Sequence, residues 1–171
     1  VTTMQVVVNP NPIPTGLNYN PVCINNTLQL QSDNVAGATY TWTGPSGFSS
    51  NVQNPSVPNF IAINEGYYVL SLIDGNGCTA SDSILVNLSP NPVADAGQDV
   101  TICIGEQAIL SASGGATYQW STGQTGSDIT VTPLLTTTYT VTVANDFGCT
   151  DSDNVVVNVI DASNLERNLY L

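Results

Sequence analysis

The sequence predicts an all-β chain folded as two tandem β-sandwich domains with essentially no helix. The first observation is an internal repeat: CINNTLQL, ATYTW, GYYVLSLIDGNGCT and SILVNL return in the same order as CIGEQAIL, ATYQW, TYTVTVANDFGCT and NVVVNV. The second is the alternation of apolar and polar residues within these segments, which is typical of half-buried strands. The third is that clusters of Gly, Asn, Asp and Ser separate them, and no segment sustains an apolar period of 3.6 residues.

The repeat also divides the chain into domains. We expect residues 10–89 and 90–160 to form the two modules, because each copy opens with a stiff Pro-Asn-Pro segment that follows an apolar run. Residues 1–9 then form either a strand of a preceding repeat or a first strand. Residues 161–171 depart from the repeat composition and are expected to be a tail.

Each module carries two cysteines, one before its second strand and one at the start of its last strand. Four cysteines permit three pairings, and only the pairs Cys23–Cys78 and Cys103–Cys149 make the two modules self-contained and equivalent. Metal binding and redox activity are disfavoured, because no two cysteines lie two to four residues apart and the chain has no histidine. We therefore expect structural disulfides within each module, which implies an oxidising compartment.

The charge of the chain excludes several classes of function. The sequence has 13 Asp and Glu residues against a single Lys or Arg, for a formal net charge of −12, and no histidine. A nucleic-acid partner is not expected, because such proteins displace phosphate counterions with Lys and Arg. No apolar stretch is long enough to span a bilayer, so no membrane insertion is expected. Without His or Lys the usual acid-base groups are missing, and the chain is predicted not to be an enzyme.

Some acidic residues are candidate calcium ligands. Asp95 and Asp99 lie between the modules, and Asp151 and Asp153 share one face of a strand near a module end. Oxygen clusters of this kind can chelate Ca²⁺ and stiffen a joint. We favour the interpretation that these residues are solvated aspartates in turns. No cofactor is therefore predicted beyond this calcium candidate.

The repeat resembles a known group of proteins. The strings TWTGPSGFSS, YQWSTGQTGSDITVTPLLTTTYTVTV and GCTASDSILVNL are similar to the Ig-like and PKD-like repeats of large secreted, adhesin-like and gliding-associated surface proteins of Bacteroidetes. The resemblance implies an Ig-like sandwich and export to the cell surface or medium, commonly by type IX secretion. The PKD signature around a WxFGDG turn is missing, which favours the generic Ig-like branch.

An Ig-like sandwich assigns roles to the aromatic residues. Trp42 and Trp120 occupy the position of the buried central tryptophan, and Tyr68 and Tyr139 fit a tyrosine corner. The rings expected to be more exposed are Phe48, Phe60 and Phe147. The segment Asp82-Ser83-Ile84 is similar to the short O-glycosylation motif of exported Bacteroidetes proteins, which makes Ser83 a candidate modification site.

These observations favour a non-catalytic spacer and adhesive scaffold, whose partners are other repeats of the same protein or neighbouring subunits. One alternative is a subunit of an extracellular filament, in which the apolar run VTTMQVVV adds a strand to a neighbour. The other is a carbohydrate-binding appendage of a secreted polysaccharide-degrading enzyme, with glycans as partners. All three readings place the chain outside the cell or at its surface.

Overall fold

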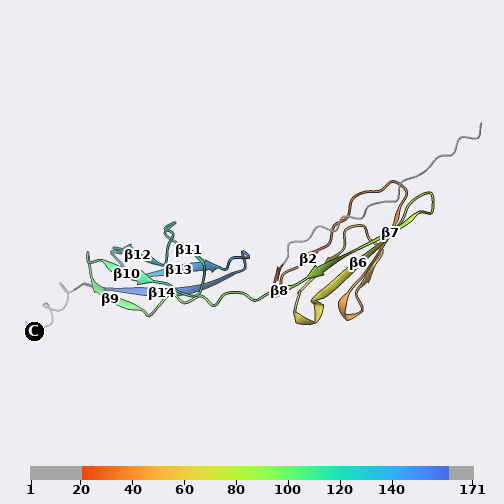
Figure 1. The fold of residues 1–171 in the computed structure, drawn as a ribbon. Coiled ribbons are helices and arrows are strands. Elements are labelled where there is room, and N and C mark those ends of the chain that lie inside the picture. Colours follow the sequence, from red (N-terminus) through yellow and green to blue (C-terminus); the bar gives the residue numbers. More distant parts are fainter. Residues whose placement is uncertain (1–20, 162–171) are drawn as a thin grey trace, which may run out of the picture. The chain divides into compact units, whose positions relative to one another are not determined.

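The computed structural model describes residues 21–161, which belong to two compact units that divide between Ser89 and Pro90. We call these units the first and second modules. Both are built from strands (Figure 1), and the helical elements of residues 21–161 are two single 3-10 turns, η1 (Pro45–Gly47) and η2 (Ala62–Asn64). None of the described helical elements is long and apolar enough to cross a membrane. The predicted all-β fold class of two tandem Ig-like sandwiches is confirmed.

The first module encloses its core between a four-stranded antiparallel sheet and a short antiparallel pair. The sheet has the strand order β4-β3-β6-β7, β2 pairs with β5, and β1 runs parallel to β8. The bounds are β1 (Val22–Cys23), β2 (Leu28–Gln29), β3 (Thr39–Thr43), β4 (Ser49–Ser50), β5 (Ser56–Val57), β6 (Gly66–Ile73), β7 (Thr79–Val86) and β8 (Leu88–Ser89).

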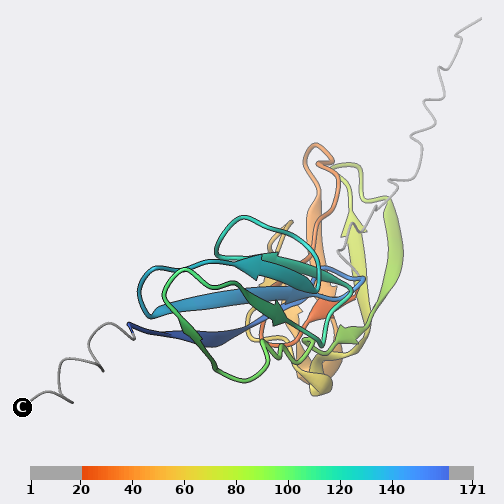
Figure 2. The same cartoon turned by 90° about the vertical axis from the view of Figure 1, so that its left-hand side faces the viewer.

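The second module repeats this architecture, and its last strand is longer, with 11 residues in β14 against 8 in β7. Its larger sheet has the order β11-β13-β14-β9, in which β9 is parallel to β14, and the facing pair is β10 with β12. Figure 2 shows β13 and β14 running side by side along this module. The bounds are β9 (Val100–Cys103), β10 (Ala108–Ser111), β11 (Thr117–Trp120), β12 (Asp128–Val131), β13 (Thr137–Ala144) and β14 (Thr150–Ile160).

The period-two pattern of the strands determines which side chains enter each core. Alternate residues of β6 and β13 are buried, while their neighbours face solvent. In each module these side chains meet the buried residues of the facing pair in one apolar cluster. The buried residues of the two long central strands are Tyr68, Leu70 and Leu72 in β6 and Tyr139, Val141 and Val143 in β13.

Candidate functional sites: the cysteines, aromatics and aspartates

Two cysteines lie in matching turns before the last long strand of each module. In the β6–β7 turn, Asp74 N–H donates to Cys78 O at 2.9 Å, and Asp74 Oδ1 accepts from Cys78 N–H at 2.8 Å. In the β13–β14 turn, Asn145 replaces the aspartate and makes the same two bonds with Cys149, both at 3.0 Å. The backbone donors, led by Cys78 N–H, hold the pKa of Asp74 below its usual range. We call Cys78 and Cys149 the turn cysteines, and their end of each module the turn end.

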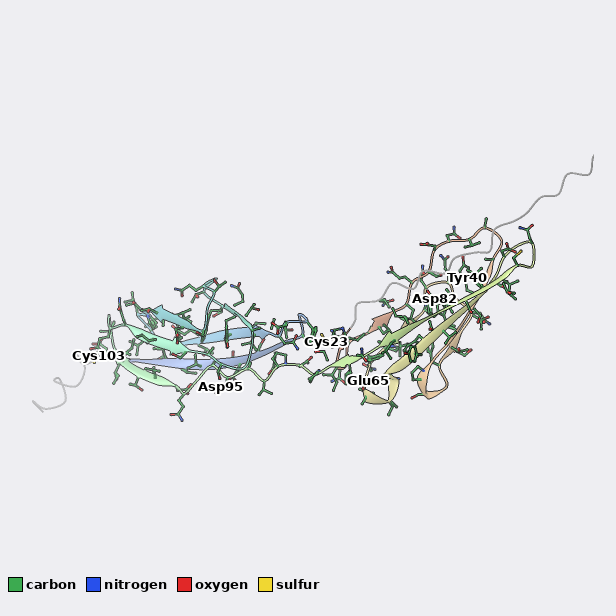
Figure 3. All side chains as sticks on the ribbon, in the orientation of Figure 1. Cys23, Tyr40, Glu65, Asp82, Asp95 and Cys103 are labelled. Atoms are coloured by element: carbon green, nitrogen blue, oxygen red, sulfur yellow. The ribbon has the colours of Figure 1, made fainter. Side chains whose placement is uncertain are left out.

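The other two cysteines lie where the last strand of each module finishes. Cys23 is the final residue of β1 and pairs with Ser89 at the end of β8. Cys103 is the final residue of β9 and pairs with Ile160 at the end of β14 (Figure 3). We call Cys23 and Cys103 the strand cysteines, and their end of each module the exit end.

The predicted pairs Cys23–Cys78 and Cys103–Cys149 are wrong. In each module the residue opposite the strand cysteine, Ser89 or Ile160, comes eleven positions after the turn cysteine along extended chain. At about 3.3 Å per residue this distance is roughly 30 Å or more. A disulfide holds its two Cα atoms only about 4.4–6.8 Å apart. The two cysteines of one module therefore lie at opposite ends of the sandwich and cannot bond to each other.

The oxidation states of the four cysteines also differ from the prediction that all four form disulfides. Cys23 and Cys149 are disulfide-bonded, whereas Cys78 and Cys103 carry free thiols. One cysteine of each kind is thus oxidised and one of each kind is reduced. The prediction failed because it took each module to be self-contained. The length of the last strand can be estimated from the sequence, but the strand that pairs with its far end and carries the other cysteine cannot.

The interior position of the antibody-type disulfide is aliphatic in both modules. In antibody domains the second cysteine follows the corner tyrosine by two positions. Here that position is Leu70 after Tyr68 and Val141 after Tyr139, and both aliphatic side chains are fully buried. Packing therefore occupies the place of the usual bridge, and within residues 21–161 the cysteines lie at the ends of the modules.

The two tryptophans lie at equivalent places in the cores. Trp42 and Trp120 are 1% and 2% exposed. Each indole N–H finds a carbonyl across the sandwich edge: Trp42 Nε1 donates to Gln53 O and Trp120 Nε1 donates to Gly126 O, both at 3.0 Å. Both tryptophans therefore act as packing residues, because a buried ring whose N–H is already bonded has no free face for a ligand.

The tyrosines and phenylalanines depart in part from expectation. Tyr68 Oη donates to Asn64 O, four residues upstream, at 2.9 Å, as a corner tyrosine does, and burial raises its pKa. Tyr139 is buried, but among the described residues its hydroxyl has no such bond. Phe60, expected to be exposed, is fully buried, while Phe147 is 64% exposed. Phe48 packs edge-on against the Tyr68 ring with centroids 5.4 Å apart.

The four calcium candidates act as backbone anchors in the second module. Within residues 21–161 no three Cys, Asp or Glu side chains lie close enough together to hold a metal ion. The pKa of Asp153 lies below its usual range, mainly because the N–H of Ala96 bonds to its carboxylate. Calcium binding stays a prediction. Asp99, Asp151 and Asp153 fasten residues 94–99 to β14, whereas Asp95 accepts a backbone bond within that segment. The bonds run from Ala94 N to Asp151 Oδ2, from Ala96 N to Asp153 Oδ2 and from Gly97 N to Asp95 Oδ1, each 2.9 Å, and from Val156 N to Asp99 Oδ1, 2.8 Å.

The structure does not test two further predictions. Ser83 lies exposed on β7, where its N–H donates to Asp82 Oδ1 at 2.8 Å, and its glycosylation stays a prediction. The apolar run of residues 1–9 and the tail from residue 162 onward lie outside the described residues.

Comparison with known proteins supports the fold. No protein-family model matches the sequence, and no curated protein matches it. Among solved structures, three N-terminal domains of the Highly Immunogenic Outer Capsid protein (Hoc) of bacteriophage RB49 are similar, with a TM-score of 0.50 at 16% identity over 85% of this chain and 58% of that one. Murine CEACAM1b is also similar, with a TM-score of 0.40 at 11% identity over 86% of this chain and 100% of that one. This chain spans less than two thirds of the Hoc fragment, and the likeness to Hoc at 16% identity shows a shared Ig-like fold alone.

Proposed function

We propose that the chain is a non-catalytic pair of Ig-like modules that serves as a spacer and adhesive scaffold in a secreted or cell-surface protein. The observation that carries this proposal is the path of the chain through the second module. Pro90 O accepts a bond of 3.1 Å from Asn145 Nδ2 at the turn end, and β14 finishes at Ile160 at the exit end. Because the chain passes from one end to the other, each such module adds roughly 35 Å of length.

The inventory of reactive groups supports a non-catalytic role. The sequence contains no histidine and a single Lys or Arg, so it lacks the usual proton-transfer groups. The carboxylates of Asp74, Asp99, Asp151 and Asp153 are engaged by backbone N–H groups. Acidic residues used in this way stabilise turns and connections and do not assemble a reaction site.

The compartment follows from the fold and the sulfur chemistry. An Ig-like fold with a disulfide indicates an extracellular domain, since such bonds persist in oxidising compartments. The likeness of the repeat to Bacteroidetes surface proteins supports export by type IX secretion and a place in an adhesin. The other repeats of that protein are the proposed neighbours.

Glycan binding has less support from the described surface. Between residues 21 and 161 the two most exposed aromatic rings are Tyr67 on β6 and Phe147 in the β13–β14 turn, which are 62% and 64% exposed and belong to different modules. A stacking platform needs several rings on one face, so a glycan array should show no binding above background. Strong binding to one polysaccharide class would favour the appendage over the scaffold.

Stretching a single molecule tests the spacer role. With handles at residues 1 and 171 and with reductant present, optical tweezers should record two separate unfolding steps. Unfolding of the second module releases roughly 70 residues and should lengthen the chain by roughly 200 Å. A single merged step, or a second module that extends without resistance, would contradict the proposal.

A further inference from the structure

The outward side of the large sheet in the first module carries no charged residue. Asp82 is the single charged residue in the four described strands of this sheet. It pairs across the sheet with buried Leu70, so it belongs to the positions that alternate with the outward ones, and its Oδ1 accepts the Ser83 N–H. We call the outward residues of β3, β6 and β7 the neutral face. They are threonines in β3, a threonine, two serines and a leucine in β7, and Tyr67, Val69, Ser71 and Ile73 in β6.

The charge of the chain makes this neutral face the place where a second copy meets least repulsion. With 13 acidic residues against a single basic one, the net charge is −12, and two copies repel each other wherever carboxylates face carboxylates. At physiological salt this repulsion reaches about 8 Å, so it acts mainly between groups that come close to contact. A cationic partner would gain no ion pair from the neutral face, whereas a second copy avoids like-charge contacts there.

The neutral face also carries exposed apolar side chains. Tyr67 of β6 and Leu85 of β7 stand directly opposite each other, and they are 62% and 42% exposed. Ile73, at the far end of β6, is 48% exposed. Exposed aromatic and aliphatic groups of this kind mark interaction surfaces, and the hydroxyls around them both donate and accept hydrogen bonds. Such a surface suits a copy of itself, as a two-fold symmetric contact requires.

The second module has the same absence of charge without the apolar anchor. The outward residues of its strands β11, β13 and β14 are uncharged, because Asp151 and Asp153 pair with core residues of β13. Thr138 occupies the position of Tyr67, and the outward residues of β13 are threonines and one alanine. The central strands of this module therefore offer a matched surface that lacks the large exposed ring.

We propose that the neutral face of the first module is an interface for a second copy of this chain, with Tyr67 and Leu85 as its apolar anchor. Eight residues in β6 and β7 make the face about 27 Å long, and four strands make it about 19 Å wide. Contact over this face would bury about 500 Å² on each copy, which is typical of a weak, transient interface. The inference deepens the proposed scaffold function and rests on it, because a series of such modules converts weak contacts into lasting association.

Charges placed on the neutral face provide the test. Ser71 is exposed and lies in one row with Thr41 and Ser81, so Ser71→Asp and Ser71→Lys change the face without touching the core. In sedimentation velocity over a concentration series, the wild-type full chain should form a reversible dimer with a Kd on the order of 100 μM. Each variant alone should dimerise about tenfold more weakly, because like charges then face each other. An equimolar mixture of the two variants should regain the wild-type affinity as a mixed dimer.

The second module supplies the control for added charge. Thr142→Asp introduces the same charge at the position equivalent to Ser71, and it should leave the Kd of the dimer unchanged. Tyr67→Ser should weaken the dimer about tenfold. The matched change Ile109→Ser, at a side chain 69% exposed on β10, should not weaken it. Circular dichroism verifies that each variant is folded.

Three results would overturn the proposal. The first is a wild-type chain that stays monomeric across the concentration series, and the second is a dimer that Thr142→Asp weakens as much as Ser71→Asp does. The third is a monomeric chain whose Tyr67 instead binds a neutral polysaccharide, which would identify a different occupant. Stretching is performed on isolated molecules, so none of these results alters the expected unfolding steps, and failure here is distinct from failure of the spacer function.

Discussion

Replacing Trp120 with Phe tests whether each module is held together by its own core. Trp120 is 2% exposed, and its Nε1 donates to Gly126 O at 3.0 Å. Phenylalanine is smaller by roughly 40 Å³, which costs about 1 kcal/mol at about 24 cal/mol per Å³ of cavity. Loss of the indole hydrogen bond costs about another 1 kcal/mol. We therefore expect the second module to lose about 2 kcal/mol of its free energy of unfolding.

Urea denaturation under reductant separates the two modules in this variant. The remaining tryptophan, Trp42, lies in the first module, so its emission reports that module alone, while circular dichroism reports both. With a slope near 1 kcal/mol per M for a domain of this size, the midpoint of the second module should fall by about 2 M. The Trp42 transition should stay where it is in the wild type. The matched variant Trp42→Phe, which removes the equivalent bond to Gln53 O, should give the converse result.

The reasoning is refuted if the Trp42 emission transition moves together with the circular dichroism signal in Trp120→Phe. That outcome means that the modules unfold as one cooperative unit, so that a defect in one core is shared by both. A change below about 0.5 kcal/mol would instead show that the buried indole and its bond contribute little, contrary to the burial argument.

Three other substitutions test separate parts of the structure. Cys103→Ser should leave the unfolding free energy of the second module unchanged in urea, whereas loss of an internal bridge would cost about 4 kcal/mol. Gly44→Ala would place a Cβ 2.6 Å from Cδ1 of the Tyr68 ring, so Trp42 emission, followed in the Trp120→Phe background, should show the first module destabilised by about 1–3 kcal/mol. Asp153 tests the pH dependence of stability. Its carboxylate has a lowered pKa in the folded state because it accepts the Ala96 N–H. The ionised carboxylate therefore contributes to the free energy of unfolding above the usual aspartate pKa, and this contribution is lost as the pH falls below about 4. Acid titration of stability should therefore be shallower in Asp153→Asn than in wild type, and an unchanged curve would contradict this role.

Local patterns were sufficient to predict the fold class. In β3 and β11 alternate residues face the core, so a period-two sequence pattern identifies strands without knowledge of their partners. The glycine- and asparagine-rich turns gave the breaks between them. These signals are local, and they predict the observed strands and turns because local backbone propensity and core packing favour the same structure.

The cysteine pairing could not be predicted, because it depends on which strands lie side by side. Whether Cys103 lies near Cys149 depends on β9 pairing in parallel with the far half of β14. Alternation fixes the face on which a residue lies but not the register or the neighbour of its strand. The assumption of self-contained modules replaced this missing information and gave the wrong pairs.

The burial of residues in irregular segments could not be predicted for a related reason. Phe60 lies in a loop, where its N–H donates to Asn26 O and its carbonyl accepts from Asn25 N–H, both at 2.8 Å. These long-range backbone bonds hold the loop against the core and bury the Phe60 ring. The alternation pattern of the strands did not predict this burial, because Phe60 lies outside any strand. The carboxylates of Asp151 and Asp153 are likewise used by a segment that precedes them by 57 residues.

The placement of sulfur changes what holds these small domains together. An internal bridge stabilises a domain by restricting its unfolded chain, and such help is common in domains that bury little surface. Here Leu70 and Val141 fill the interior position of that bridge, so each core depends on packing and on the satisfied indole N–H of its tryptophan. The stability of each module therefore comes from its own apolar core.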